Sequence, residues 1–231
     1  MKIKIFCDSA DYKTIKELNK NSLVGGFTTN PSLMRKAGAK DYTKYCKSIL
    51  KITKKPISFE VFADDNNNII KQALKIKDWG KQIYVKVPVT NSKGIFLGKV
   101  ISYLNKKNIK LNITAVYTSK QTAQILKKIN KKTKVIISIF AGRMADKGKD
   151  PIPEFEKSIK LAKKYNNVEI LWASVREPYN YIQAKQLNCH IISAPPKIIE
   201  KIENFGKSFK KLTVDTVKAF LVDSKKSKYK L

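Results

Sequence analysis

The stretch QIYVKVPVT, residues 82–90, has the alternating pattern of a β-strand. Isoleucine or valine occupies every second position, and the positions between hold Tyr84, Lys86, Pro88 and Thr90. Lys86 therefore lies in the middle of a strand, with a valine on each side. Its amine either faces solvent or is buried for a chemical purpose, and the rest of the sequence bears on that choice.

Seven further runs of this kind recur along the chain, so eight strands are expected, at residues 3–8, 25–30, 57–62, 83–88, 111–116, 135–140, 169–174 and 190–195. Between them, apolar residues at three- and four-residue spacing predict helices at 11–20, 41–51, 68–79, 93–107, 122–130, 153–165, 179–187 and 196–205. Strict alternation of strand and helix is typical of a parallel sheet. Eight such units in 231 residues predict an α/β fold of the (β/α)8 TIM barrel type. A doubly wound open sheet is the alternative.

A last apolar pattern follows the eighth unit. Residues 213–231 predict one extra C-terminal helix that ends in a lysine-rich basic tail. Neither a linker nor a sequence repeat interrupts the chain before it. We therefore expect residues 1–231 to form a single barrel domain, with 213–231 as its terminal helix and tail.

Lysine dominates the charge of the chain. The 48 Lys and Arg residues outnumber the 18 Asp and Glu residues, which gives a formal net charge of +30. Such a balance occurs in proteins that bind nucleic acids or anionic surfaces. Here the lysines are spread over every segment without a recognition motif, so a basic nucleic-acid-binding protein is only the non-enzymatic alternative. Only Arg35, Arg143 and Arg176 are arginines, and a retained arginine suggests a need for its planar fork in binding an anion.

The remaining composition indicates a globular protein of a reducing compartment. Hydrophobic residues make up 42% of the chain, yet no apolar run approaches the ~20 residues of a membrane span. The first residues lack the pattern of a signal peptide. Cys7, Cys46 and Cys189 are too few and too scattered for a disulfide framework or a zinc site. We therefore expect a cytoplasmic protein with no membrane partner and no bound metal.

Polar residues recur at the ends of the predicted strands, where TIM barrels carry their chemistry. They are Asp8, Asn30, Glu60, Lys86, Asn112, Thr114, Ser138, Arg143, Ser174 and Arg176. Any one of them, taken alone, is equally well explained by an outward, solvated position. Together they are better explained by one shared cavity, because burying an ionisable group without a partner costs several kcal/mol.

A shared cavity gives Lys86 a chemical role. A lysine between valines on a barrel strand is poorly hydrated, which disfavours its ammonium form. The neutral amine attacks a ketone and forms a Schiff base, and the resulting iminium accepts electrons from a neighbouring C–C bond as it breaks. The single histidine, His190, has no Ser or Cys partner pattern, so we interpret it as a core residue. Acid–base work then falls to Asp8 and Glu60.

At these residues the chain resembles the transaldolase family, in particular the small subgroup that includes the fructose-6-phosphate aldolases, and it does so over nearly its whole length. The most specific matches are GGFTTNPSL (25–33) and VKVPVT (85–90). Further matches are FCDSA (6–10), LNITAVYTSKQ (111–121, with Gln121), SIFAGRMADKG (138–148) and WASVREP (172–178). The family carries its lysine on the fourth strand, whereas many other Schiff-base barrel aldolases carry it on the sixth. In this chain the predicted fourth strand holds a lysine and the predicted sixth strand does not.

The resemblance implies a role for each matching residue. Lys86 would form the iminium with a ketose phosphate, and Asp8 would move the proton of the hydroxyl on the carbon that leaves as aldehyde. Glu60 and Thr114 would hold the water that shuttles protons during imine formation. The three-carbon dihydroxyacetone unit would be bound by Asn30, Asn112 and Ser138. The phosphate would be held by Arg143, Ser174 and Arg176, whereas Arg35 is expected on a helix surface.

The same resemblance favours transfer over cleavage. Fructose-6-phosphate aldolases tend to have Gln where this chain has Glu60, and Tyr where it has Phe140. A tyrosine hydroxyl could protonate the bound enamine and release dihydroxyacetone, which Phe140 cannot do. We therefore expect a transaldolase of the pentose phosphate pathway, which passes a dihydroxyacetone unit from sedoheptulose 7-phosphate or fructose 6-phosphate to an aldose phosphate. Cleavage of fructose 6-phosphate to dihydroxyacetone and glyceraldehyde 3-phosphate is the alternative.

Two departures from the family pattern bear on the substrate. Ile139 replaces the usual proline, and Glu177 follows Arg176 where a basic or polar residue is more usual. An acid at that position would either weaken phosphate binding or pair with the arginine. The resemblance implies no cofactor. It also implies a homo-oligomer, because small members of the family often associate through the C-terminal helix.

Overall fold

The eight strands form a closed parallel barrel in which each strand pairs with its neighbours in chain order and β8 returns to β1. The structure, a computed structural model, describes residues 3–228. The strands are β1 (Lys4–Asp8), β2 (Val24–Thr28), β3 (Ile57–Glu60), β4 (Ile83–Pro88), β5 (Leu111–Val116), β6 (Val135–Phe140), β7 (Val168–Ala173) and β8 (Ile191–Ala194). Closure confirms the predicted TIM barrel, and the alternative of an open sheet is wrong.

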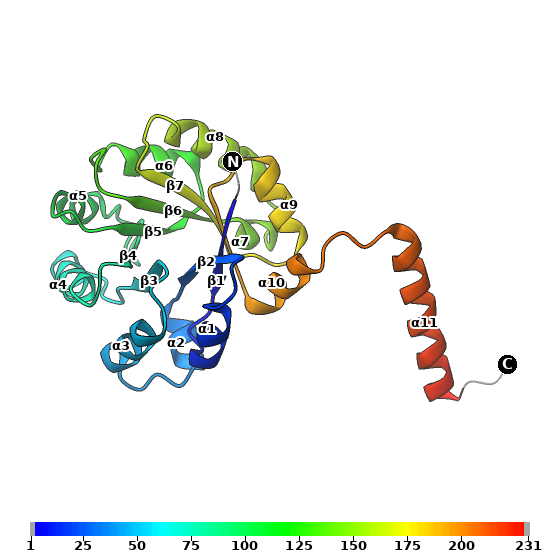
Figure 1. Ribbon diagram of the computed structural model, residues 1–231. Helices are drawn as coiled ribbons and strands as arrows, with labels where there is room; N and C mark the ends of the chain where they lie inside the picture. The colour runs from blue at the N-terminus through cyan, green and yellow to red at the C-terminus, as the bar shows by residue number, and fades with distance from the viewer. Residues whose placement is uncertain (1–2, 229–231) are drawn as a thin grey trace.

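The helices surround this barrel, apart from the last one (Figure 1). They are α1 (Tyr12–Leu18), α2 (Pro31–Lys36), α3 (Tyr42–Ile52), α4 (Asn66–Lys77), α5 (Gly98–Lys106), α6 (Ser119–Leu126), α7 (Ala141–Ala145), α8 (Ile152–Ala162), α9 (Tyr179–Gln186), α10 (Pro196–Glu203) and α11 (Phe209–Ser227). Within residues 3–228, no helix has both the length and the apolar character needed to cross a membrane.

Three differences from the predicted helices have local causes. The sequence pattern missed α2 and α7, because helices of six and five residues are too short to show a period. The predicted helix 93–107 begins only at Gly98, since Thr90 and Phe96 pair in an isolated antiparallel bridge. The terminal helix begins at Phe209 and not at residue 213, because Ser208 caps it by accepting a hydrogen bond from the Lys211 N–H.

Side-chain caps fix the start of several barrel helices, which sets the direction of each loop at the carboxyl ends of the strands. Asp11, Asp41 and Asp65 each accept a hydrogen bond from the N–H three residues later. Thr118 and Gln121 form a capping box at the start of α6. Gln121, which belongs to one of the family motifs, therefore has a structural task in this chain.

The outer faces of the strands pack against the helices and form the main core. Phe155 of α8 stacks on Trp172 of β7 with ring centroids 4.4 Å apart, and Trp79 meets Phe59 of β3 edge-on at 6.1 Å. The three cysteines are free and buried. This apolar layer holds the strands rigidly, so side chains that point inward from them keep fixed positions.

The terminal helix α11 lies apart from the barrel (Figure 1). None of its residues is buried, and Phe209, Val217 and Phe220 are exposed to 88%, 59% and 68%. Residues 229–231 of the predicted basic tail lie outside the described residues. The division into a barrel domain and a terminal segment from residue 213 stays a prediction.

Candidate active site

A cavity of about 560 Å³ opens at the carboxyl ends of the strands. All of the predicted site residues except Asn112 line it, from Asp8 on β1 to Arg176 after β7. Asn112 is fully buried, where it donates to Ser58 Oγ (3.0 Å) and accepts from Ser138 Oγ (2.7 Å). Residues that are far apart in the sequence thus meet in one pocket, as expected for inward positions at the same end of a barrel.

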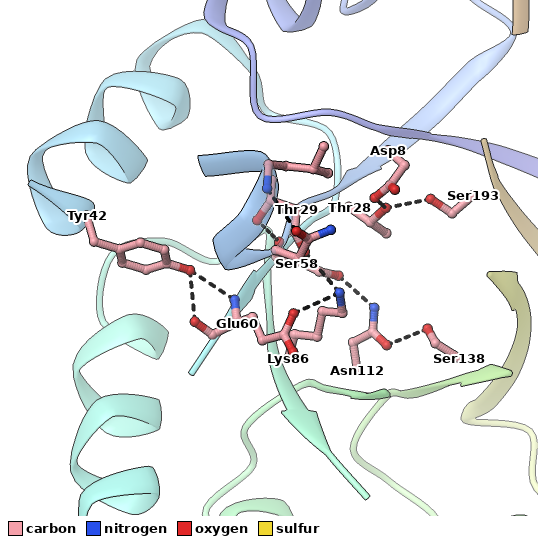
Figure 2. A network of polar contacts seen from close by, with 12 residues as sticks. Asp8, Thr28, Thr29, Tyr42, Ser58, Glu60, Lys86, Asn112, Ser138 and Ser193 are labelled. Carbon is pink, nitrogen blue, oxygen red and sulfur yellow. Dashed lines mark hydrogen bonds and ion pairs between the residues drawn. The ribbon is translucent and has the colours of Figure 1, made fainter. Parts of the chain in front are cut away.

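The amine of Lys86 is inside this cavity and not in solvent. Lys86 is 6% exposed, and its Nζ lies 3.0 Å from Glu60 Oε2 and donates to the Thr29 carbonyl oxygen at 3.0 Å (Figure 2). The ion pair offsets the cost of burying both charges. The same carboxylate is a proton acceptor within reach of the amine, so the pair can pass to the neutral amine and the protonated acid.

Asp8 is held by a chain of hydroxyl groups on the other side of the cavity. The Thr28 hydroxyl donates to Asp8 Oδ1 at 2.7 Å, so the Ser193 hydroxyl, 2.5 Å from Thr28 Oγ1, donates to Thr28 in turn (Figure 2). Burial raises the pKa of Asp8, and the charge of Lys86 and the Thr28 hydrogen bond oppose that rise. A carboxyl group of raised pKa is suited to exchange protons with a substrate hydroxyl.

Thr114 has the one buried hydroxyl on the cavity wall that lacks a hydrogen-bond partner among residues 3–228. A buried hydroxyl without a partner is costly unless a ligand or water binds it. Asn30 accepts a hydrogen bond from the Leu33 N–H at 2.9 Å and thereby begins α2. This bond fixes its side chain at the cavity rim.

Two arginines border the side of the cavity formed by β6 and β7. The Arg143 guanidinium lies 5.3 Å above the ring of Phe140, a cation–π contact. A Cβ atom at Gly142 would come within 1.8 Å of the Ser174 carbonyl oxygen, so only glycine lets α7 approach the end of β7. Ser174 itself has a φ of 65°, which is sparsely populated for serine. This close approach brings the segments that carry Arg143 and Arg176 together.

Arg176 pairs with Asp146 and not with its sequence neighbour Glu177. Its Nε donates to Asp146 Oδ1 at 3.0 Å and its Nη2 to Oδ2 at 2.6 Å, while Nη1 donates to the Ser174 carbonyl oxygen at 3.3 Å. The hydrogen bond to Arg176 lowers the pKa of Asp146. The carboxylate takes one edge of the guanidinium, so N–H groups on Nη1 and Nη2 still face away from it.

His190 lies at the opposite end of the barrel, just before β8. Its Nδ1 accepts a hydrogen bond from the Ile170 N–H at 3.1 Å, and burial lowers its pKa. Its side chain is half-buried and does not line the cavity. Arg35 is exposed on α2. Among residues 3–228, no group of three or more His, Cys, Asp or Glu side chains is placed to hold a metal ion.

The sequence analysis missed several polar residues around the cavity. Thr28, Lys36 and Ser193 line it, and Tyr42 contacts the backbone of Glu60. Alternation along β8 would have placed Ser193 inside, and Thr28 belongs to a matched motif, so both had a signal. Tyr42 and Asp146 act through contacts between segments distant in sequence, for which the sequence carries no pattern.

Comparison with known proteins agrees with this arrangement. The sequence matches the family described as Transaldolase/Fructose-6-phosphate aldolase over residues 5–231. The chain belongs to this family. A probable transaldolase of Thermoanaerobacter sp. is 33% identical over 198 residues, which are 85% of this chain and 88% of that one. One from Methanococcus vannielii is 31% identical over 222 residues, or 96% and 97% of the two chains.

Solved structures outside the transaldolase/fructose-6-phosphate aldolase family share the fold. A putative dihydrodipicolinate synthase family protein from Coccidioides immitis superposes with a TM-score of 0.61 over 82% of this chain and 65% of that one. An inosine 5′-monophosphate dehydrogenase from Legionella pneumophila gives 0.57 over 83% and 57%. Both are 10% identical to this chain, so the likeness concerns the barrel alone.

Proposed function

We propose that this chain is a transaldolase, which carries a dihydroxyacetone unit on Lys86 from a ketose phosphate to an aldose phosphate. The observation that carries the proposal is the buried amine of Lys86 beside the Glu60 carboxylate, in a cavity that also contains Asp8. Family membership supports an enzyme of the transaldolase or aldolase type. Sugar phosphates are the substrates expected for that family.

The first step joins the amine to the substrate. Glu60 accepts a proton from Lys86, and the neutral Nζ attacks the C2 carbonyl of the ketose phosphate. The carbonyl oxygen leaves as water, with protons relayed by Glu60 and a water that the Thr114 hydroxyl can bind. The product is an iminium ion between Lys86 and the substrate.

The second step breaks and remakes a C–C bond. Asp8 accepts the proton of the C4 hydroxyl, the C3–C4 bond breaks, and its electrons pass into the iminium to give an enamine. The aldose phosphate leaves as an aldehyde. A second aldose phosphate binds, the enamine attacks its aldehyde carbon, and Asp8 returns the proton to the new hydroxyl. Hydrolysis of the iminium then frees Lys86.

The rim of the cavity matches this substrate class in charge. Arg143 and Arg176 border it on one side, together with Ser174, and they present planar donors suited to a phosphate. Asn30 and Ser138 also line the cavity, and the buried Asn112 accepts a hydrogen bond from Ser138; these three residues would bind the hydroxyls of the three-carbon unit. Phe140 also lines the cavity and offers no hydroxyl to protonate the enamine.

Reductive trapping tests the chemistry. Incubation with fructose 6-phosphate and borohydride should fix a six-carbon adduct, or its three-carbon remnant, on the peptide that contains Lys86. Lys86→Met is the control and should give none. Activity that persists in Lys86→Met, with no adduct in the native enzyme, would refute the proposal.

The same substrate separates transfer from cleavage. Without an acceptor, a transaldolase releases at most one equivalent of glyceraldehyde 3-phosphate per site, because the enamine persists, whereas added erythrose 4-phosphate allows turnover. Continuous release of dihydroxyacetone without acceptor would identify the chain as an aldolase of the same family. Phe140→Tyr should raise that release if a hydroxyl at this position protonates the enamine.

We also propose that the chain forms a homo-oligomer through α11. Its apolar side chains, including Leu212, Val217 and Phe220, are exposed, and burying them against a second copy would remove that surface from water. The lysines of α11 repel one another, so association should strengthen with salt. Light scattering of the full chain tests this, and Phe220→Asp should give monomers. A native chain that is monomeric at all salt concentrations would refute it. The cytoplasmic location stays a prediction.

A further inference from the structure

Tyr42 contacts Glu60 at the point where the hydrogen-bonded pairing of β2 with β3 ends. The pairing of β2 with β3 ends at Thr28 and Ser58, whereas β3 stays paired with β4 up to Glu60 and Lys86. Alternate residues of a strand direct their backbone groups to opposite neighbours. The Ser58 carbonyl oxygen accepts a hydrogen bond from the Thr29 N–H, so the backbone groups of Ser58 face β2. The N–H and C=O of Glu60, two residues later, face the same side, where β2 no longer offers a partner.

Lys86 uses one of the groups that this opening frees. The carbonyl of Thr29, the residue that follows β2, accepts a hydrogen bond from Lys86 Nζ at 3.0 Å. It is therefore turned to the amine. The opening thus creates an acceptor for the amine and leaves the backbone of Glu60 in need of a partner, because buried N–H and C=O groups are costly when unpaired.

Tyr42, the first residue of α3, supplies that partner. Its hydroxyl donates to the Glu60 carbonyl oxygen at 2.8 Å and accepts from the Glu60 N–H at 3.1 Å (Figure 2). Burial raises the pKa of this phenol, so it stays neutral and serves as donor and acceptor at once. The rings of Phe62 and Trp79, with centroids 5.4 Å and 6.3 Å away, hold the phenol in place.

We propose that Tyr42 is a positioning residue for the Schiff-base chemistry, which replaces the missing strand at Glu60 and keeps the Glu60 carboxylate within reach of Lys86. This inference rests on the proposed function. Its consequence is specific to the proton transfers that form and hydrolyse the iminium. Phosphate binding takes place at the β6 and β7 side of the barrel and does not depend on Tyr42.

Tyr42→Phe tests the role, because it removes the hydroxyl and keeps the ring. Each passage of fructose 6-phosphate through the iminium exchanges its C2 oxygen with water, so loss of ¹⁸O from labelled substrate without acceptor measures these transfers directly. We expect exchange and kcat to fall about tenfold, because the Glu60 backbone loses its partner and the carboxylate is held less well beside Lys86. The KM for fructose 6-phosphate should stay unchanged.

Tyr45→Phe is the matched control. Tyr45 lies one turn later on α3, and its hydroxyl donates to the Ala10 carbonyl oxygen at 3.0 Å. The substitution removes one hydrogen bond from a tyrosine hydroxyl to a backbone carbonyl on the same helix, so it should lower the melting temperature, by less than Tyr42→Phe, which removes two hydrogen bonds. Oxygen exchange in Tyr45→Phe should equal that of the native enzyme.

A double-mutant cycle with Glu60→Gln shows whether Tyr42 acts through Glu60. If it does, Tyr42→Phe has no further effect on exchange once Glu60 is replaced. Additive effects in the cycle, or native exchange in Tyr42→Phe, would overturn the positioning role while the trapped adduct on Lys86 still stands. A native enzyme that shows neither exchange nor adduct would overturn the proposed function and this inference with it.

Discussion

The barrel strands carry two neighbouring layers of inward side chains that differ sharply in chemistry. The lower layer is an apolar cluster of Phe6, Tyr84, Ile136, Leu171 and Ile191, which Ala173 of the next layer also contacts. Two residues further along the same five strands lie Asp8, Lys86, Ser138, Ala173 and Ser193, and all of these line the cavity. One pleat, about 6.6 Å of strand, separates the apolar floor from a wall that carries an acid, an amine and hydroxyls.

The two layers depend on each other. The apolar floor keeps the dielectric low beneath Lys86, which strengthens its interaction with Glu60. Asp8, Lys86, Ser138 and Ser193 each have a specific partner, as in the pairs Lys86–Glu60 and Asp8–Thr28. The lower layer should therefore determine stability and the upper layer activity, and substitutions in either one test that division.

The largest expected effect is that of Lys86→Met in the upper layer. The thioether fills the volume of the lysine stem but supplies no amine, so transfer should fall on the order of 10⁵-fold. The Glu60 carboxylate loses its cation, which should lower the free energy of unfolding by about 3 kcal/mol. The second substitution Glu60→Gln should recover this stability, because it removes the unpaired charge. Activity assays and urea unfolding check both expectations. Substantial transfer by Lys86→Met would mean that the layer holds no nucleophile.

Asp8→Asn should separate activity from stability within the upper layer. The amide cannot accept the C4 proton, so transfer should fall about 10³-fold. Because burial raises the pKa of Asp8, the folded chain retains its proton where the unfolded chain has lost it. The stability of the native protein should thus decrease as the pH rises above about 4, through the window up to the folded-state pKa.

Asp8→Asn removes the carboxyl group whose titration lowers the stability of the native protein. Asp8→Asn should therefore unfold at a higher temperature than the native protein at pH 7, and the difference should shrink toward pH 4. Thermal unfolding between these two pH values measures it. A variant that is less stable at pH 7 would show that the contact with Thr28 matters more than the cost of burying the charge.

Phe6→Ala is the counterpart on the same strand, two residues before Asp8. Phe6 is 3% exposed, and its ring lies against Gly26, where an added Cβ would come within 2.7 Å of it. Truncation leaves a void in the floor and should cost about 3–5 kcal/mol of unfolding free energy. The folded fraction should still transfer dihydroxyacetone, with kcat per folded molecule close to native. A large loss of kcat in folded protein would break the division between the layers.

This division explains which features the sequence could predict. Strand alternation places Lys86 and Asp8 inside once the fold is a barrel, because inward positions follow from the period of two. The bounds of the eight strands are nearly those predicted, since most of these runs are rich in β-branched and aromatic residues. The short helices α2 and α7 were missed because six and five residues are too few to show a helical period.

Contacts between distant segments could not be predicted in the same way. Tyr42 replaces a strand partner only because β2 and β3 diverge after Ser58, and this divergence has no local signal. Glu177 is adjacent to Arg176 in the sequence, yet Arg176 pairs with Asp146, 30 residues earlier. Adjacency in the sequence does not show which residue a long side chain contacts, because the side chain can turn toward any neighbouring segment.

Asp146→Asn should have the smallest effect, and it tests the rim of the cavity, which lies above both layers. Asp146 holds the Nε and Nη2 edge of Arg176, and N–H groups on Nη1 and Nη2 remain available to a phosphate. An asparagine keeps one acceptor and loses the charge, so the guanidinium should be less well ordered. We expect KM for phosphorylated substrates to rise about threefold with kcat unchanged. Glu177→Gln removes the same charge from the residue next to Arg176 without touching this pair, and its KM should stay native. A lower KM in Asp146→Asn would mean that the carboxylate competes with the phosphate for Arg176 and does not orient it.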